Sequence, residues 1–127
     1  MSSPASAIDA GLSRRITDLI ASGSVEISPR ELHRLPEIGS LLPAGSCVYV
    51  PSLPGLPLSR TLEAIASIRA VGLDAVPHVS ARRILNRDEF KEFLAKASKE
   101  HGVHRVLLLA GHEAKPKGPF ADSIQIL

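Results

Sequence analysis

Apolar residues recur along this chain at two spacings that alternate from the N-terminus to the C-terminus. Spacings of three and four residues, which place side chains on one face of a helix, occur in three segments. Between them lie short apolar runs, rich in Val, Ile and Leu, of the kind that form strands. The predicted helices are Ile8 to Ile20, Ser59 to Val71 and Asn86 to His101, and the predicted strands are residues 24–28, 47–50, 73–79 and 106–111.

Prolines set several of the predicted boundaries. Pro29 is expected at the first position of a short helix that Pro36 then limits, because proline fits the first turn of a helix and not its interior. Pro77 is expected to mark the end of the third strand, because proline has no N–H for the ladder. The fourth strand, VLLLAG, is apolar throughout, which is typical of a parallel sheet covered on both faces. Residues 121–127 are expected to begin another helix.

This order is a strand–helix unit repeated four times, which predicts the parallel α/β fold class. We expect residues 1–22 to form an N-terminal tail and lead-in helix, and residues 23–127 to form four βα units of a single α/β domain. A (βα)8 barrel typically needs about 250 residues, whereas an open doubly wound sheet can be built from four or five strands. With 127 residues, length alone favours a small open doubly wound sheet.

The composition narrows the classes of function. One cysteine, Cys47, excludes an intrachain disulfide and a cysteine-based zinc site, and it favours a reducing, cytoplasmic location. A net charge of only +2, one Tyr, three Phe and no Trp offer neither a basic stripe nor a stacking platform, so no nucleic-acid partner is expected. No run reaches the roughly 18 apolar residues of a membrane helix, and the start lacks the features of a secretory signal, so no membrane partner is expected.

Polar residues at the strand ends are the candidates for chemistry, because parallel α/β folds bind ligands at the C-terminal ends of their strands. Glu26 is the foremost candidate, because a carboxylate between Val25 and Ile27 in a buried strand must be paired, protonated or used in a reaction. Alternatively, it points to solvent from the polar face of the strand. His78 and His112 end the third and fourth strands. With Glu26 they could hold a metal ion, or they could simply bond to the backbone.

Four segments carry a resemblance to a known family: SVEISPRE (24–31), CVYVPS (47–52), SRTLEAIASIRAVGLDAVPHVS (59–80), and HGVHRVLLLAGHEAKPKG followed by FADSI. They resemble the first four βα units of the methylenetetrahydrofolate reductase family. The members of this family are flavin-dependent TIM-barrel oxidoreductases of folate one-carbon metabolism. In that family the first strand has the form F-E-[FI]-x-P-P. The third has the form GLxxxPHLT after a helix opened by R-T, and the fourth ends in L-R-G-D-x-P. The most specific match is RT followed by GLDAVPHVS.

The resemblance implies an activity and a site. The implied cofactor is FAD. The implied reaction is the reduction of 5,10-methylenetetrahydrofolate to 5-methyltetrahydrofolate, with NAD(P)H as a candidate electron donor. Glu26 corresponds to the general acid of the family. The flavin-binding positions that the resemblance implies are Ser52, His78, Ala110, Gly111 and His112. Ala110 and His112 replace the Arg and Asp of the family motif, and Pro51-Ser52-Leu53 replaces a T-Y-G-like turn.

The resemblance also implies a different architecture from the open sheet, namely the first half of a TIM-type (βα)8 barrel. Four βα units cover about half of such a barrel and leave an exposed last strand, which is prone to pairing. We therefore expect a fragment or shortened relative that forms a homo-oligomer or is completed by further chain. The alternative function is a non-catalytic folate-binding or interaction module derived from the same barrel.

Overall fold

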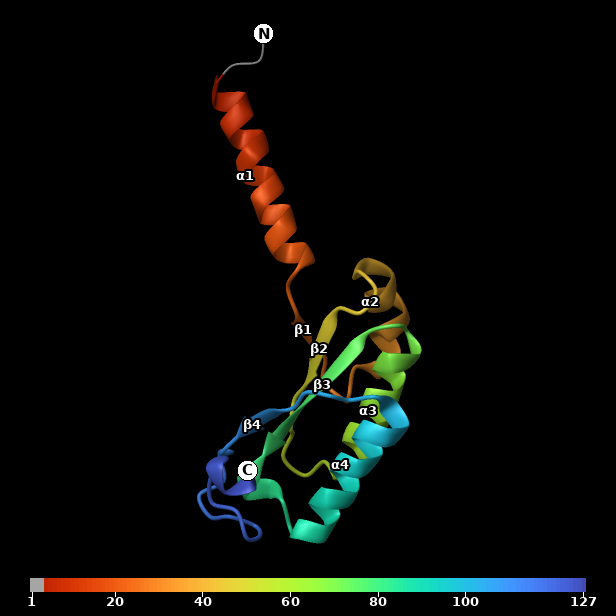
Figure 1. The fold of residues 1–127 in the computed structure, drawn as a ribbon, viewed down its shortest axis with the longest axis vertical. Coiled ribbons are helices and arrows are strands. Elements are labelled where there is room, and N and C mark those ends of the chain that lie inside the picture. The colour runs from red at the N-terminus through yellow and green to blue at the C-terminus, as the bar shows by residue number, and fades with distance from the viewer. Residues whose placement is uncertain (1–3) are drawn as a thin grey trace.

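The computed structural model describes residues 4–127, in which helices and strands alternate (Figure 1). The helices are α1 (Pro4–Ala21), α2 (Leu35–Leu41), α3 (Leu58–Ala70) and α4 (Arg87–His101). The strands are β1 (Val25–Glu26), β2 (Cys47–Val50), β3 (Asp74–Ser80) and β4 (Leu107–Leu109). Short 3-10 turns lie at η1 (Leu32–Arg34), η2 (Ala81–Arg83) and η3 (Ile124–Ile126).

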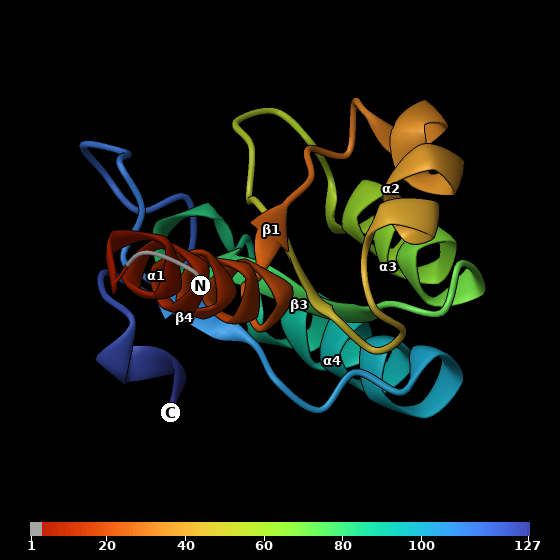
Figure 2. The same ribbon diagram turned by 90° about the horizontal axis from the view of Figure 1, so that it is seen from above.

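The four strands form one sheet in the order β1-β2-β3-β4, and every pair is parallel. The prediction of a parallel α/β fold is therefore confirmed. Strands that follow one another in sequence also lie next to one another, and α2, α3 and α4 lie on the same side of the sheet (Figures 1 and 2). A doubly wound sheet has helices on both faces, so this arrangement differs from the open doubly wound sheet that length alone favoured.

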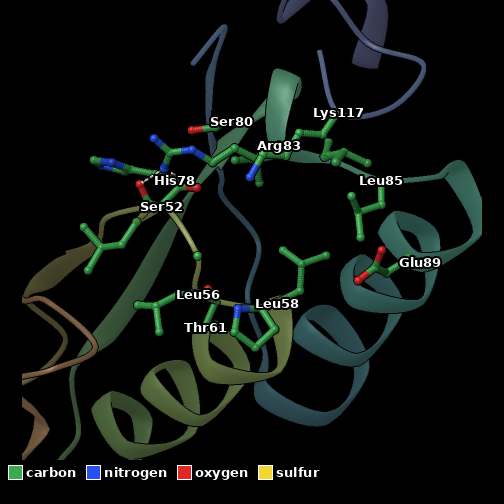
Figure 3. Close-up of a pocket in the computed structure, with 15 residues that line it drawn as sticks. Ser52, Leu56, Leu58, Thr61, His78, Ser80, Arg83, Leu85, Glu89 and Lys117 are labelled. Carbon is green, nitrogen blue, oxygen red and sulfur yellow. Dashed lines mark hydrogen bonds between the residues drawn. The ribbon is translucent and has the colours of Figure 1, made fainter. Parts of the chain in front are cut away.

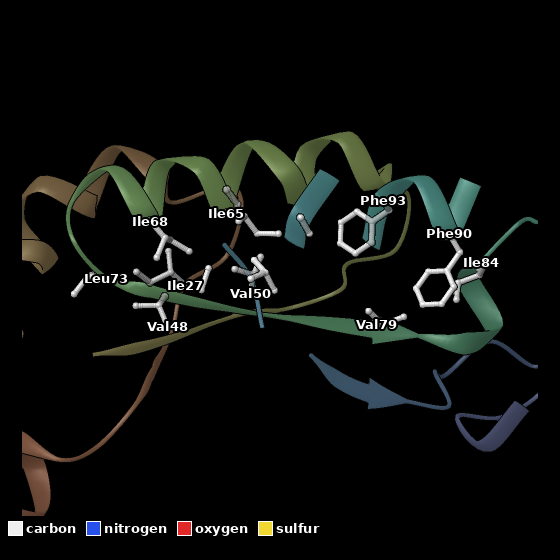
Figure 4. Packing of buried hydrophobic residues seen from close by; sticks show 14 of the residues in the cluster. Ile27, Val48, Val50, Ile65, Ile68, Leu73, Val79, Ile84, Phe90 and Phe93 are labelled. Atoms are coloured by element: carbon white, nitrogen blue, oxygen red, sulfur yellow. The ribbon is translucent and has the colours of Figure 1, made fainter. Parts of the chain in front are cut away.

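The core lies between the sheet and α3 and α4. Val48 and Val50 of β2 point toward α3, where Ile65 and Ile68 are completely buried (Figure 4). The strands present alternate residues to this side, as the two-residue period of a strand requires. The core is aliphatic near β1 and β2. Phe90 and other aromatic residues join it near the N-terminal end of α4.

Helix α4 begins and ends as its sequence predicts. The Asn86 side chain accepts a hydrogen bond from the Glu89 N–H at 2.8 Å, which caps the first turn. Gly102 follows the helix in a left-handed conformation, with φ of 66°, which suits glycine. The residues on its inner face, Phe90, Phe93 and Ala97, are buried.

The opposite face of the sheet, termed the open face, is not covered by α2, α3 or α4, although Val76 and Ser80 on that side of β3 are buried. The register places Glu26 beside Tyr49 and His78 beside Leu107, on the side away from the helices. Leu107 and Leu109 remain 39% and 37% exposed. The prediction that the fourth strand is covered on both faces is therefore wrong for residues 4–127. The reason is that α2, α3 and α4 all pack against the other side.

Three proline predictions are wrong. Pro29 lies in a turn before η1 instead of at the first position of a helix, because the chain turns there before it becomes helical. Pro36 lies in the first turn of α2 instead of limiting a helix, because proline is tolerated there. Pro77 lies inside β3 and pairs with Val50 in register. It is the last residue of β3 that pairs with β2, and β4 begins to pair at His78, so the missing N–H falls where the partner strand changes.

Helix α1 extends away from the sheet (Figure 1). Its position in the sequence agrees with the prediction, but its apolar stripe does not pack on the core. The stripe residues are 48% to 73% exposed: Leu12, Ile16, Leu19 and Ile20. At the other end of the chain, residues 121–127 contain only the single turn η3 instead of the start of a helix. None of the helices described has both the length and the apolar character that crossing a membrane requires.

Candidate functional site

Glu26 and His78 meet on the open face of the sheet. The Glu26 carboxylate Oε2 lies 3.9 Å from His78 Nε2. Tyr49 lies between their strands, on β2, and its ring is 5.7 Å from the His78 ring, centre to centre, at 59°. The parallel register produces this cluster, because Glu26, Tyr49 and His78 each point away from the helices on adjacent strands.

The two side chains differ in exposure. The Glu26 side chain is 59% exposed and the His78 side chain is 13% exposed. The prediction that Glu26 lies in a buried strand is therefore wrong for the described chain. Its neighbours Val25 and Ile27 face the helices and pack on the core, whereas Glu26 faces the side that no helix covers. The alternative, in which Glu26 points to solvent, therefore describes its environment, and Glu26 also lies close to His78.

A cavity of about 230 Å³ lies at the C-terminal ends of β2 and β3 (Figure 3). It lies between the loop that follows β2, the start of α3 and the turn that follows β3. Its polar lining comes from Ser52, Thr61, His78, Ser80, Arg83, Glu89 and Lys117, and its apolar lining includes Leu53, Leu56, Leu58 and Leu85. Two residues proposed from the sequence as flavin contacts, Ser52 and His78, therefore line one cavity.

The other three sequence candidates lie elsewhere. Ala110, Gly111 and His112 follow β4 and are not among the residues that line the cavity. Gly111 has a φ of 101°, which only glycine adopts without strain. A Cβ atom at Gly111 would lie 2.8 Å from Glu113 Oε2 and 3.5 Å from the Ser80 Cβ. The positive φ therefore favours glycine here, and a Cβ would in addition push the Glu113 carboxylate aside.

Arg83 is a cavity residue that the sequence interpretation missed. It lies in η2, directly after β3. Its Nε donates to Glu113 Oε1, and its Nη1 donates to the Ser52 carbonyl and, at 3.3 Å, to Ser52 Oγ. The side chain is only 14% exposed. The signal that could have found it is the pair of arginines directly after a strand end, where parallel α/β folds place ligands.

The preceding arginine ties down the C-terminal segments. Arg82 Nε donates to the Ala121 carbonyl at 2.7 Å, and its Nη1 donates to the Glu113 carbonyl at 2.8 Å. The Arg82 carbonyl accepts from the Lys117 N–H at 2.8 Å. Arg82 and Arg83 together connect the segments that follow β2, β3 and β4.

Glu113 is the anion of this network. Its side chain is 15% exposed, and Oε2 is buried without a hydrogen-bond partner among residues 4–127. The hydrogen bond from Arg83 lowers the pKa of Glu113, and it outweighs the desolvation that would raise it. Glu113 is therefore an ionised partner for Arg83 at neutral pH.

The metal-binding alternative lacks a ligand cluster. Glu26 and His78 are close, but His112 is exposed on the segment after β4. Among the residues that the structure describes, no group of three His, Cys, Asp or Glu side chains is close enough to hold a metal ion. A metal-dependent reaction through these three residues therefore has no geometric support.

A second charged cluster lies at the opposite end of the sheet. Asp74, at the start of β3, accepts from Arg105 Nη2 at 2.9 Å and from Arg69 Nη1 at 3.4 Å. Arg105 Nη2 also lies 2.8 Å from the Cys47 Sγ. The hydrogen bond to Asp74 is the largest cause that raises the pKa of Arg105, and the contact with Cys47 raises it further. These contacts join the N-terminal ends of β2 and β3 to the segment before β4, which is a structural role.

The cavity has apolar residues on one side and hydrogen-bonding residues on another. Leu56 and Leu58 lie along one side of it, and Ser52 and His78 lie on another (Figure 3). Arg83 adds N–H donors close to Ser52 and His78. An isoalloxazine ring likewise has an apolar part and an edge of oxygen and nitrogen acceptors, and two of the five residues that the resemblance implies for a flavin, Ser52 and His78, line this cavity. No family model matches the chain.

Proposed function

We propose that the chain is part of a methylenetetrahydrofolate reductase-like enzyme, an FAD-dependent oxidoreductase that reduces 5,10-methylenetetrahydrofolate to 5-methyltetrahydrofolate. The observation that carries the proposal is the Glu26–His78 pair, which lies on the open face while His78 also lines the adjoining cavity. The pair offers an acid for a folate on the open face, and the residue His78 also borders the cavity next to the start of α3. The sequence resemblance over residues 24–124 supports the same assignment.

We propose further that the sheet is half of a TIM-type barrel. In such a barrel the strands follow one another in order, all helices lie outside, and the inner face carries packed side chains. The sequential parallel order and the one-sided helices support this proposal. The open face with Glu26, Tyr49 and His78 corresponds to the interior, which a second copy or further chain would cover.

Glu26 acts in this proposal as the general acid. Ser52 and His78 would hold the flavin, and Gly111 and the residues beside it belong to the binding positions that the resemblance implies. When bound, a reduced flavin supplies the hydride for the methylene carbon of the folate. Glu26 gives its proton to N10 of the folate, which is released as the five-membered ring opens while the carbon stays on N5 of the pterin, and His78 lies 3.9 Å from the carboxyl.

Covering the open face is part of this mechanism. A general acid must carry a proton at the working pH, and desolvation favours the neutral carboxyl. Glu26 is 59% exposed in the described chain, so its own strands do not provide that desolvation. A second copy or further chain across the open face would provide it. NAD(P)H is the proposed source of the electrons.

A second candidate function is a folate-binding or interaction module without hydride transfer. The observation that favours it is the position of residues 110–112 away from the cavity, together with Ala110 and His112 in place of the Arg and Asp of the family motif. Loss of a cation and a carboxylate near the flavin leaves the folate side of the site intact.

Reconstitution separates the two candidates. The purified protein is incubated with FAD, passed through a desalting column, and examined for the visible flavin spectrum. Its binding of 5-methyltetrahydrofolate is then measured by calorimetry. The reductase proposal predicts retained flavin and folate binding. A protein that binds folate and retains no flavin supports the binding module, and a protein that binds neither contradicts both.

A further inference from the structure

The Arg83 guanidinium has hydrogen-bonding capacity left over at the wall of the cavity. A guanidinium carries five N–H donors in a fixed plane. Nε donates to Glu113, and Nη1 donates to Ser52. Within residues 4–127, Nη2 donates to no acceptor, and Arg83 is a lining residue of the cavity. Arg83 therefore keeps donors that no acceptor of the described chain takes, at a residue that lines the cavity.

The direction of the guanidinium is fixed without any ligand. Glu113, from the segment after β4, holds it on one side, and the Ser52 carbonyl, from the loop after β2, holds it on another. Because both partners come from different strand ends, the side chain has little freedom to turn away. Donors that are fixed before binding cost less conformational entropy when a ligand arrives.

We propose that Arg83 is a ligand-binding residue of this cavity and that it donates through Nη2 to an oxygen acceptor of the bound molecule. The acceptor is a carbonyl or an oxyanion at the polar edge of a flat ligand. The proposal rests on the proposed function in one respect, that a flavin ring carbonyl is the first such acceptor to test. It gives Arg83 a role that neither the sequence motifs nor the resemblance assigns.

Arg83 also holds Ser52, so a purely structural role must be separated from a binding role. Two substitutions break the same ion pair from opposite ends. Arg83→Met removes the donors. Glu113→Gln leaves the guanidinium in place, keeps an amide oxygen as an acceptor, and removes the charge that competes with a ligand for Arg83. A binding role predicts opposite effects of the two changes, whereas a structural clamp predicts the same loss.

The test is riboflavin binding, followed by fluorescence quenching, in the full chain and its variants. We expect Arg83→Met to weaken binding by about tenfold or more, Arg83→Lys to bind with intermediate affinity, and Glu113→Gln to bind at least as tightly as the original chain. Arg60→Met, which removes an exposed arginine on α3, is the matched control and should bind normally. Circular dichroism shows whether each variant is folded.

A second probe keeps this inference separate from the flavin proposal. Inorganic phosphate offers an oxyanion without a ring, and its binding is followed through the NMR signals of the arginine side chains. If the chain ignores riboflavin but phosphate shifts the Arg83 signals, the flavin proposal fails and the role of Arg83 stands. If riboflavin binds equally to Arg83→Met, or if neither probe involves Arg83, the inference is overturned.

Discussion

The Arg83–Glu113 pair shows how single residues shape the strand-end edge of this protein. Both side chains are more than four-fifths buried, so each charge depends on the other for compensation. Neither residue belongs to a recognisable motif, and thirty positions of sequence separate them. Only the fold brings them together, which is why the sequence indicated Glu26 and His78 and not this pair.

Glu113 makes stability depend on pH in a defined direction. The Arg83 hydrogen bond lowers the pKa of Glu113 in the folded protein below its ordinary 4.5. A carboxyl with a lowered folded pKa stabilises the fold at pH values above its unfolded pKa, and this contribution is lost as the pH falls through the folded pKa. Glu113→Gln should therefore cost about 1 to 3 kcal/mol at neutral pH and progressively less at pH values below 4.5. Urea denaturation across this range measures the difference, and a constant difference would contradict the assignment.

A side chain at position 111 is expected to destabilise the folded protein. Its φ of 101° is strained for other residues, and a Cβ would lie 2.8 Å from Glu113 Oε2. Gly111→Ala should destabilise the protein by about 1 to 3 kcal/mol in thermal or urea denaturation. Gly11→Ala is the matched control, because nothing lies within 4 Å of its Cβ position in α1, and it should be neutral or stabilising. Equal effects of the two changes would show that the backbone at Gly111 is not constrained as described.

At the scale of elements, local chemistry predicted the three longest helices well, and the short helices and the limits of the strands less well. Asn86, Glu89 and Gly102 define α4 through contacts within a few residues, so its limits were readable from the sequence. Strand β1 shrinks to Val25–Glu26 because strand length depends on a partner elsewhere in the chain. The exposure of β4 likewise depends on which face of the sheet the helices pack against, and the hydrophobicity of the strand alone does not predict that.

The helices also differ in what they contribute to stability. Ile65 of α3 is completely buried against the sheet, whereas Leu19 of α1 is 72% exposed. Ile65→Ala should cost about 2 to 5 kcal/mol, and Leu19→Ala should change the free energy of unfolding by less than about 0.5 kcal/mol. Urea denaturation monitored by circular dichroism compares the two. A large loss in Leu19→Ala would mean that α1 packs on a partner in solution.

For the whole molecule, the repeating order of elements predicted the parallel sheet but left the number of covered faces undetermined. All-parallel sheets are almost always covered on both faces, and here one face carries exposed Leu107 and Leu109 beside the Glu26–His78 pair. The helices of the chain therefore cover one face of the sheet, and in the proposed half barrel another polypeptide covers the other face. The Glu26–His78 pair of the proposed site lies on that other face.

Solution mass tests whether a second copy is that polypeptide. Light scattering should give twice the chain mass of 13.5 kDa. Leu109→Glu places a charge on the open face and should return the protein to a single chain mass. Leu41→Glu, a change at a 74% exposed residue of α2 on the helical side, should leave the pair intact. A single chain mass for the unchanged protein would rule out a second copy as the cover.

The most direct test of the reductase proposal is the rate at which 5,10-methylenetetrahydrofolate reoxidises the reduced flavin of the reconstituted protein, measured by stopped-flow absorbance. Glu26→Gln should slow this step by about 100-fold or more, because it removes the proton donor. Reduction of the flavin by NAD(P)H should be unaffected, and Glu37→Gln, at an exposed glutamate of α2, should leave both steps unchanged. Folate-dependent reoxidation that proceeds equally fast in Glu26→Gln would contradict the role assigned to Glu26.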